Sequence, residues 1–237
     1  MKKVVLNIPH SSTFIPEGAI DNITISNNEL GFLVDFMTDK DVDKLWNFVS
    51  PENKQVATIS RLIVDTERYR NDADEPMSLK GMGLYYTHTP NGKRFRSWNE
   101  ETYLRCLDIY DEYHLSLETK VAKCLAEHEK CVILDCHSFH DGMSYTGYKA
   151  NTFPDVCIGV NYDITEDAKY IIDIFKSAGY SVKVNEPFTG SLVPLKYLND
   201  TRITSVMIEI NRRIYDNASF DVVQNLCKRI YAELNEK

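Results

Sequence analysis

Short hydrophobic runs alternate along this chain with longer segments in which apolar residues recur every three or four positions. A continuous apolar run of about four to eight residues is typical of a strand buried on both faces, and the longer spacing is typical of a helix that packs one face against a core. The pattern therefore predicts strands with helices between them. The predicted strands are residues 3–8, 57–65, 131–135, 156–160, 181–185 and 205–210.

The longest helical pattern covers residues 99–129. A second one covers residues 29–49 and is interrupted by the polar residues 38–41. Thr165 and Ser219 are expected to begin two further helices, because threonine and serine are favoured at that position. Since strands and helices alternate to the end of the chain, we predict an α/β fold. We expect a single three-layer αβα domain over residues 1–237, with a mixed, mainly parallel sheet.

Residues 67–99 follow neither pattern and are rich in polar residues and glycine. A segment of that length without regular structure is usually functional or disordered. Its tyrosine, arginine and tryptophan side chains favour a functional role.

Composition limits the possible partners. A net charge of −8 argues against a nucleic-acid or anionic-membrane surface. No apolar run reaches the roughly 18 residues of a membrane helix. The six cysteines contain no C-x-x-C pair, as expected of a reduced, cytoplasmic protein. We therefore predict a cytoplasmic protein with no nucleic-acid and no membrane partner, and its oligomeric state stays open.

Two of the predicted strands lead into a histidine that is followed by a serine, at His10 and His137. Open α/β sheets bind their ligands at the carboxyl ends of the strands. Two imidazoles at that edge suit a zinc site, which needs a third protein ligand and an open position for catalysis. The alternative for His10 is a loop histidine bonded to nearby backbone. Ser138 suggests a serine hydrolase, but the chain has no G-x-S-x-G motif.

The third metal ligand is expected to be an oxygen donor. Asp39 interrupts the apolar face of the helical pattern over 29–49, where a charge needs a cationic partner. We expect Asp135 to point away from His137 and to have a supporting role. The competing candidates are Asp35, Asp135 and His140.

Glu209 lies among apolar residues of the predicted strand 205–210. A carboxylate in a buried run must be paired or take part in chemistry. Beside a metal site, it is placed to act as the general base. The alternative is a structural salt bridge with Arg212 or Arg213.

Arginines surround the end of the second predicted strand, at positions 61, 68 and 70. The guanidinium group binds carboxylates through paired hydrogen bonds. Arg68 is therefore a candidate for holding an anionic substrate, with a surface ion pair to Asp72 or Asp74 as the alternative. We also expect Ser138 and Asn211 to contact the substrate.

The order of these motifs resembles the N-formylglutamate amidohydrolase family, nearly from end to end. The motifs are PHSS, RLIVDTER, GMGLYYTHT, DCHSF, PDVCIG, GSLVPL and IEINRRIY. That family is related in fold to zinc carboxypeptidases and to the succinylglutamate desuccinylase and aspartoacylase enzymes. The resemblance implies a zinc-carboxypeptidase-like fold and one Zn²⁺ ion bound by His10, Asp39 and His137. It also implies that Glu209 is the general base and that Arg68 helps to bind the substrate.

The resemblance implies a zinc-dependent amidohydrolase that cleaves a small N-acyl group from an acidic amino acid. N-formyl-L-glutamate is the leading substrate, giving formate and L-glutamate in a last step of histidine breakdown. Thr13 stands where carboxypeptidases have a glutamate, and DTER replaces the DLNR of some family members. The alternatives are another N-acyl amino acid amidohydrolase, a carboxypeptidase-like metallopeptidase and, from another class, a catalytically inactive binding module.

Overall fold

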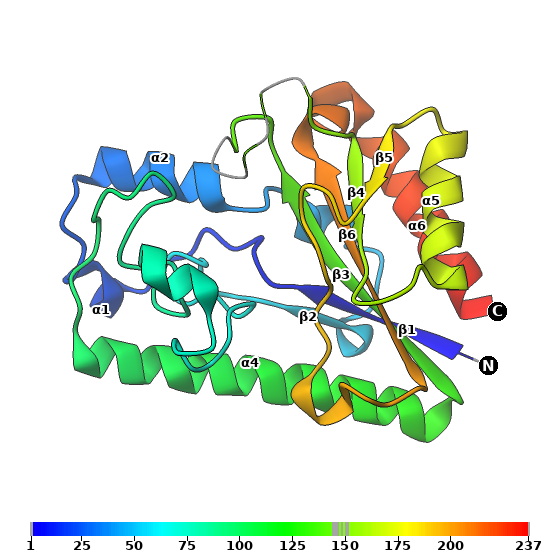
Figure 1. The fold of residues 1–237 in the computed structure, drawn as a ribbon, viewed down its shortest axis with the longest axis horizontal. Helices are drawn as coiled ribbons and strands as arrows, with labels where there is room; N and C mark the ends of the chain where they lie inside the picture. The colour runs from blue at the N-terminus through cyan, green and yellow to red at the C-terminus, as the bar shows by residue number, and fades with distance from the viewer. Residues whose placement is uncertain (1, 144–146, 148, 150–151, 237) are drawn as a thin grey trace. The chain divides into compact units, whose positions relative to one another are not determined.

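The computed structural model describes residues 2–143, 147, 149 and 152–236 of the chain (Figure 1). The chain divides into two compact units. The first unit consists of Met1–Ile8, Asp41–Gln55 and Leu117–Lys237, and the second of Pro9–Lys40 and Val56–Ser116. The single domain expected over residues 1–237 stays a prediction.

A six-stranded sheet forms the centre of the first unit, with the strand order β2-β1-β3-β6-β4-β5. The pairs β1–β3, β3–β6 and β4–β5 are parallel, and β4–β6 is antiparallel. The expected mixed, mainly parallel α/β sheet is thereby confirmed. The strands are β1 (Lys2–Ile8), β2 (Lys54–Val56), β3 (Lys130–Phe139), β4 (Val156–Gly159), β5 (Val182–Val184) and β6 (Ile203–Asn211).

Helices pack against the sheet of the first unit (Figure 1). On one face, Leu117 and Val121 of a long helix share a buried cluster with Val5, Cys131 and Ile133. The alternate residues of the same strands are also buried, because successive side chains point to opposite faces. The helices are α3 (Val42–Leu45), α5 (Glu166–Ser177), α6 (Phe220–Glu236) and the last turns of α4 (Glu100–Glu127), with 3₁₀ turns at Pro51–Asn53, Leu195–Tyr197, Arg212–Ile214 and Asn217–Ser219.

The second unit contains α1 (Glu17–Ile20), α2 (Asn27–Met37), a 3₁₀ turn (Pro76–Lys80) and the first turns of α4. The helical pattern predicted over 29–49 is two helices, α2 and α3. Thr38 leaves the helical conformation with ψ 137°, and Asp41 takes a left-handed conformation with φ 60°. The polar residues 38–41 therefore end one helix before the next begins. Within the described residues, no helix is both long and apolar enough to cross a membrane.

The prediction of a strand over residues 57–65 is wrong. Strand β2 lies just before it, and residues 61–63 form a turn in which the Ile63 amide bonds to the Ser60 carbonyl at 2.9 Å. Leu62, Ile63 and Val64 are buried in the core of the second unit instead of pairing in a sheet. A short apolar run has the same sequence pattern in a buried turn as in a buried strand.

Candidate functional site

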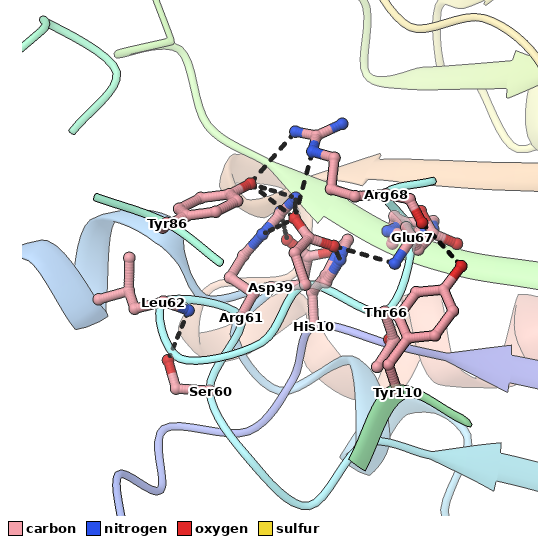
Figure 2. Close-up of polar contacts among 12 residues, drawn as sticks. His10, Asp39, Ser60, Arg61, Leu62, Thr66, Glu67, Arg68, Tyr86 and Tyr110 are labelled. Carbon is pink, nitrogen blue, oxygen red and sulfur yellow. Dashed lines mark hydrogen bonds and ion pairs between the residues drawn. The ribbon is translucent and has the colours of Figure 1, made fainter. Parts of the chain in front are cut away.

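His10 lies two residues beyond β1 and belongs to the second unit, where a carboxylate faces each nitrogen of its ring (Figure 2). The Nε2 atom is 2.8 Å from Asp65 Oδ1, and Nδ1 is 3.7 Å from Asp39 Oδ2. The Asp39 amide also donates to the His10 carbonyl at 2.9 Å, so the segment after α2 is tied to the backbone that carries His10. All three side chains are buried. His10 is therefore bonded to a side-chain carboxylate, not only to nearby backbone.

Asp65 is the most fully bonded carboxylate of this cluster. Its Oδ2 accepts hydrogen bonds from the Tyr86 hydroxyl at 2.6 Å and from Arg61 Nη2 at 2.8 Å, and its Oδ1 accepts from the Glu67 amide at 3.0 Å. Burial alone would raise the pKa of Asp65, but the charges of Arg61 and Arg68 and the hydrogen bond from His10 hold this pKa well below its usual range. Asp65 is thus a buried, ionised hydrogen-bond acceptor. Our sequence analysis missed it, although it stands at the head of the DTER motif.

Buried backbone contacts hold the loop that carries Arg61 and Asp65. The Asp65 amide donates to the Leu84 carbonyl at 2.9 Å. Arg96, which is fully buried, donates through Nη1 to the carbonyls of Ile63 at 2.8 Å and Leu62 at 3.3 Å. Arg96 therefore fixes the backbone beside Arg61.

Arg68 lies beside Tyr86 (Figure 2). Its Nη2 donates to the Tyr86 hydroxyl at 3.2 Å, and its Nε is 3.6 Å from Asp65 Oδ2. Burial by itself lowers the pKa of Arg68, but its contacts with Tyr86 and Asp65 raise that pKa overall. The ion pair seen for Arg68 is thus with Asp65, rather than with Asp72 or Asp74 as in the surface alternative. The side chain is 22% exposed, so part of the guanidinium can meet a ligand.

Two side chains of α4 fix the backbone around Glu67. The Tyr110 hydroxyl donates to the Arg68 carbonyl at 2.8 Å, and His114 Nε2 donates to the Thr66 carbonyl at 2.8 Å. The two rings also stack, with centroids 4.1 Å apart. Burial lowers the pKa of His114, which favours its neutral form. The backbone carbonyls on either side of Glu67 are therefore both held by side chains of α4.

In the first unit, His137 lies on β3 with a carboxylate behind its ring. Its Nε2 is 3.2 Å from Asp135 Oδ1. Asp135 also accepts from Asn7 Nδ2 at 2.8 Å and from the Leu192 amide at 2.8 Å. The expectation that Asp135 points away from His137 is wrong, because residues two apart on a strand share a face. The contact between Asp135 and His137 agrees with the supporting role expected of Asp135.

Glu209 is the partner of His137 in the register between β3 and β6. Directly paired residues on neighbouring strands project to the same side, so this carboxylate and imidazole share a face of the sheet. Glu209 is 8% exposed. One of its alternative salt-bridge partners, Arg213, instead bonds to Asp141 at 2.6 Å and to Asp155 at 2.9 Å. The register places Glu209 beside His137, and its role as a general base stays a prediction.

The other predicted site residues have different surroundings. Ser138 is buried, and within the described part of the chain its Oγ has no hydrogen-bond partner. Asn211 donates to Asp141 Oδ1 at 2.7 Å and accepts from the Arg213 amide at 3.2 Å. Contact of either residue with substrate stays a prediction. Of the competing metal ligands, Asp35 is exposed, and His140 accepts a hydrogen bond from the Gly142 amide at 3.0 Å.

Solved structures share this fold. One is an N-formylglutamate amidohydrolase from Ralstonia eutropha JMP134, with a TM-score of 0.83 and 19% identity, covering 100% of this chain and 94% of the other. Another is a gene product from Agrobacterium tumefaciens, with a TM-score of 0.72 and 18% identity, covering 98% and 88% of the two chains. At these identities, the likeness establishes the fold. No curated protein matches the chain.

A model of the N-formylglutamate amidohydrolase family matches residues 2–216. Because this match covers most of the chain, the protein is a hydrolase that acts on amide bonds. It belongs to the N-formylglutamate amidohydrolase family.

Proposed function

We propose that the protein is a zinc-dependent deformylase that cleaves N-formyl-L-glutamate to formate and L-glutamate. The pairing of His137 with Glu209 on adjacent parallel strands carries the proposal, because it sets a metal-ligand type beside a carboxylate base. Family membership supports the amide-hydrolysing chemistry. We further propose that the protein works in the cytoplasm, in a last step of histidine breakdown; its buried, free cysteines are in keeping with a reducing compartment.

The two histidines have the environment of metal ligands. A metal-binding histidine usually donates its second ring N–H to a carboxylate, which fixes the tautomer and the ring orientation. His10 has Asp65 in that place, and His137 has Asp135. In this arrangement, Nδ1 is the atom of each ring that would bind the metal ion. The donor set therefore fits a zinc site.

A carboxylate completes the proposed site. Asp39 Oδ2 lies 3.7 Å from His10 Nδ1. Two ligand bonds of about 2.1 Å at a tetrahedral angle hold their atoms about 3.4 Å apart, so Asp39 needs only a small adjustment. Glu67 is a second candidate, because it offers a carboxylate in the same unit as His10, two residues after Asp65. It was missed in the sequence, where it occupies the third position of DTER.

The path of the chain also supports joint binding by the two histidines. Asn7 of β1 pairs with Asp135 of β3, and the strands run in the same direction. His10 comes three residues after Asn7, and His137 comes two residues after Asp135. Both histidines are therefore carried by the carboxyl ends of neighbouring strands, where α/β sheets bind their ligands.

In the proposed reaction, the side chains divide the tasks. Glu209 accepts a proton from the attacking water and later returns it to the leaving amine. Arg68 binds a substrate carboxylate through its guanidinium group. The chemistry that a bound zinc ion supplies is polarisation of the acyl carbonyl and a lower pKa of the attacking water.

Metal content and turnover of purified variants test the proposed site. We expect His10→Ala and His137→Ala to lose the metal, and Glu209→Gln to keep it while turnover falls by about 100-fold or more. Asp39→Asn and Glu67→Gln, measured side by side, identify the carboxylate ligand. Unchanged zinc stoichiometry in both histidine variants would refute the metal site.

A panel of N-acyl amino acids tests the substrate. N-formylglutamate should be cleaved faster than N-formylglutamine, which keeps the α-carboxylate and lacks the side-chain charge. N-acetyl- and N-succinylglutamate report on the acyl group. Arg68→Ala should raise KM strongly, and Arg68→Lys should recover little because lysine lacks the planar fork. Equal cleavage of the glutamate and glutamine derivatives would contradict recognition of the side-chain carboxylate.

A further inference from the structure

We propose that Arg61 is a positioning residue that holds Asp39 and Asp65 on the two sides of His10 and thereby sets the affinity of the site for a divalent metal ion. This inference rests on the proposed function, because it takes His10 to be a metal ligand. Our sequence analysis noted Arg61 only as one of three arginines near a strand end.

One guanidinium group contacts both carboxylates. Arg61 Nη2 is 2.8 Å and Nε is 3.2 Å from Asp65 Oδ2, and Nη1 is 3.9 Å from Asp39 Oδ1. The Arg61 side chain is 14% exposed, and both carboxylates are almost fully buried. The contacts therefore lie in a largely desolvated environment, where the two hydrogen bonds to Asp65 and the ion pair with Asp39 are weakly screened by solvent.

Arg61 and His10 use opposite oxygens of each carboxylate. Arg61 binds Oδ2 of Asp65, and His10 binds Oδ1. At Asp39 the order is reversed, because Arg61 faces Oδ1 and His10 faces Oδ2. The four side chains thus form a closed ring of contacts: histidine, carboxylate, guanidinium, carboxylate. Rotation of either carboxylate breaks a contact on both of its sides.

This ring has a direct consequence for metal binding. Asp65 accepts the Nε2–H of His10, so the lone pair lies on Nδ1, the atom that faces Asp39. The same guanidinium group is hydrogen-bonded to Asp65 and ion-paired with Asp39. Arg61 therefore prepares one imidazole nitrogen and one carboxylate oxygen as neighbouring donors before a metal ion arrives.

The positive charge of Arg61 by itself weakens metal binding, whereas the positioning of the ligands strengthens it. A cation beside the site repels a divalent ion, so removal of the charge alone would strengthen metal binding. Loss of the partners that orient metal ligands typically weakens metal affinity by about 10- to 100-fold. The two effects are separable, because Arg61→Lys keeps the charge and loses the planar fork, whereas Arg61→Met loses both.

The experiment is a zinc titration of metal-free protein against a competing chelator. We expect Arg61→Lys and Arg61→Met each to weaken Zn²⁺ binding by about 10-fold or more. With Co²⁺ in place of Zn²⁺, the visible absorption spectrum should also change, since it reports ligand geometry. Arg70→Met is the matched control: Arg70 pairs with Asp111 in an exposed ion pair, and we expect its Zn²⁺ affinity to stay within about twofold of wild type.

The outcomes separate this inference from the proposed function. If Arg61→Lys binds zinc like wild type and Arg61→Met binds it more tightly, Arg61 acts only through its charge, and the inference is overturned. The same holds if neither variant changes the affinity while His10→Ala abolishes binding. If wild type binds no zinc, or His10→Ala binds it normally, the proposed function itself fails. Should Arg61→Met not fold, the decision rests on Arg61→Lys.

Discussion

Replacement of Asp65 by asparagine should destabilise the protein far more than the loss of one hydrogen bond would. The substitution keeps the size of the side chain and removes its charge. Asp65 accepts hydrogen bonds from His10 and Glu67 on one oxygen, and from Arg61 and Tyr86 on the other. An amide can accept at one end only, so its NH₂ group must face donors at the other end.

The structure sets the scale of the effect. Asp65 is fully buried and is the ion-pair partner of Arg61. Removal of one member of a buried pair typically costs about 3–5 kcal/mol, because the other charge stays buried without compensation. A domain is stable by about 5–15 kcal/mol in total. We therefore expect Asp65→Asn to lower the free energy of unfolding by about 4 kcal/mol, the middle of the range for broken buried pairs.

The assay is urea unfolding of metal-free protein, followed by fluorescence and circular dichroism. Chelator is present throughout, because a bound metal ion would itself stabilise the folded state. Asp111→Asn is the control: Asp111 makes two hydrogen bonds to Arg70 at 2.7 and 2.8 Å, but both side chains are about half exposed, so the loss should stay below about 1 kcal/mol. Equal losses in the two variants would refute the reasoning.

Two further predictions concern supporting contacts. Tyr110→Phe removes the hydrogen bond to the Arg68 carbonyl; we expect about 1 kcal/mol of destabilisation and a higher KM with little change in kcat, measured by urea unfolding and steady-state kinetics. Burial raises the pKa of Asp155, but hydrogen bonds from Ser181 and the contact with Arg213 lower it overall. Its stabilisation is therefore present above the unfolded pKa of about 4 and is lost as the pH falls through the folded value. The stability gap between wild type and Asp155→Asn should shrink from pH 7 to pH 3, and a constant gap in urea midpoints would contradict this sign.

The strands that pair inside the sheet were the most predictable elements. Strands β1, β3, β4 and β6 each coincide with an apolar run in the sequence, with end points that differ by a few residues; the partly buried edge strand β5 also lies within a predicted strand. Burial on both faces requires such runs, which is why they are informative. The run over 57–65 has the same composition, but its backbone bonds to a turn and to Arg96. Those partners come from distant positions that no local pattern reveals.

The candidate site was predictable only in part. His10, His137 and Glu209 could be found because each is a polar residue in or just after an apolar run. Asp65 and Arg61 could not be assigned from the sequence, because their contacts depend on how a turn folds around the His10 ring. The spacing of four residues between them is ordinary for a surface ion pair, and burial is what distinguishes this one.

The position of β6 explains how His137 and Glu209, which are 72 residues apart in the chain, lie beside each other. The sheet order inserts β6 between β3 and β4, so Glu209 pairs with His137 on one side and with Cys157 on the other. Burial raises the pKa of Cys157 to about 11, and its Sγ donates to the Phe188 carbonyl at 3.2 Å. The thiol therefore stays protonated at neutral pH in the metal-free protein. Glu209 thus lies between an imidazole on β3 and a protonated thiol on β4.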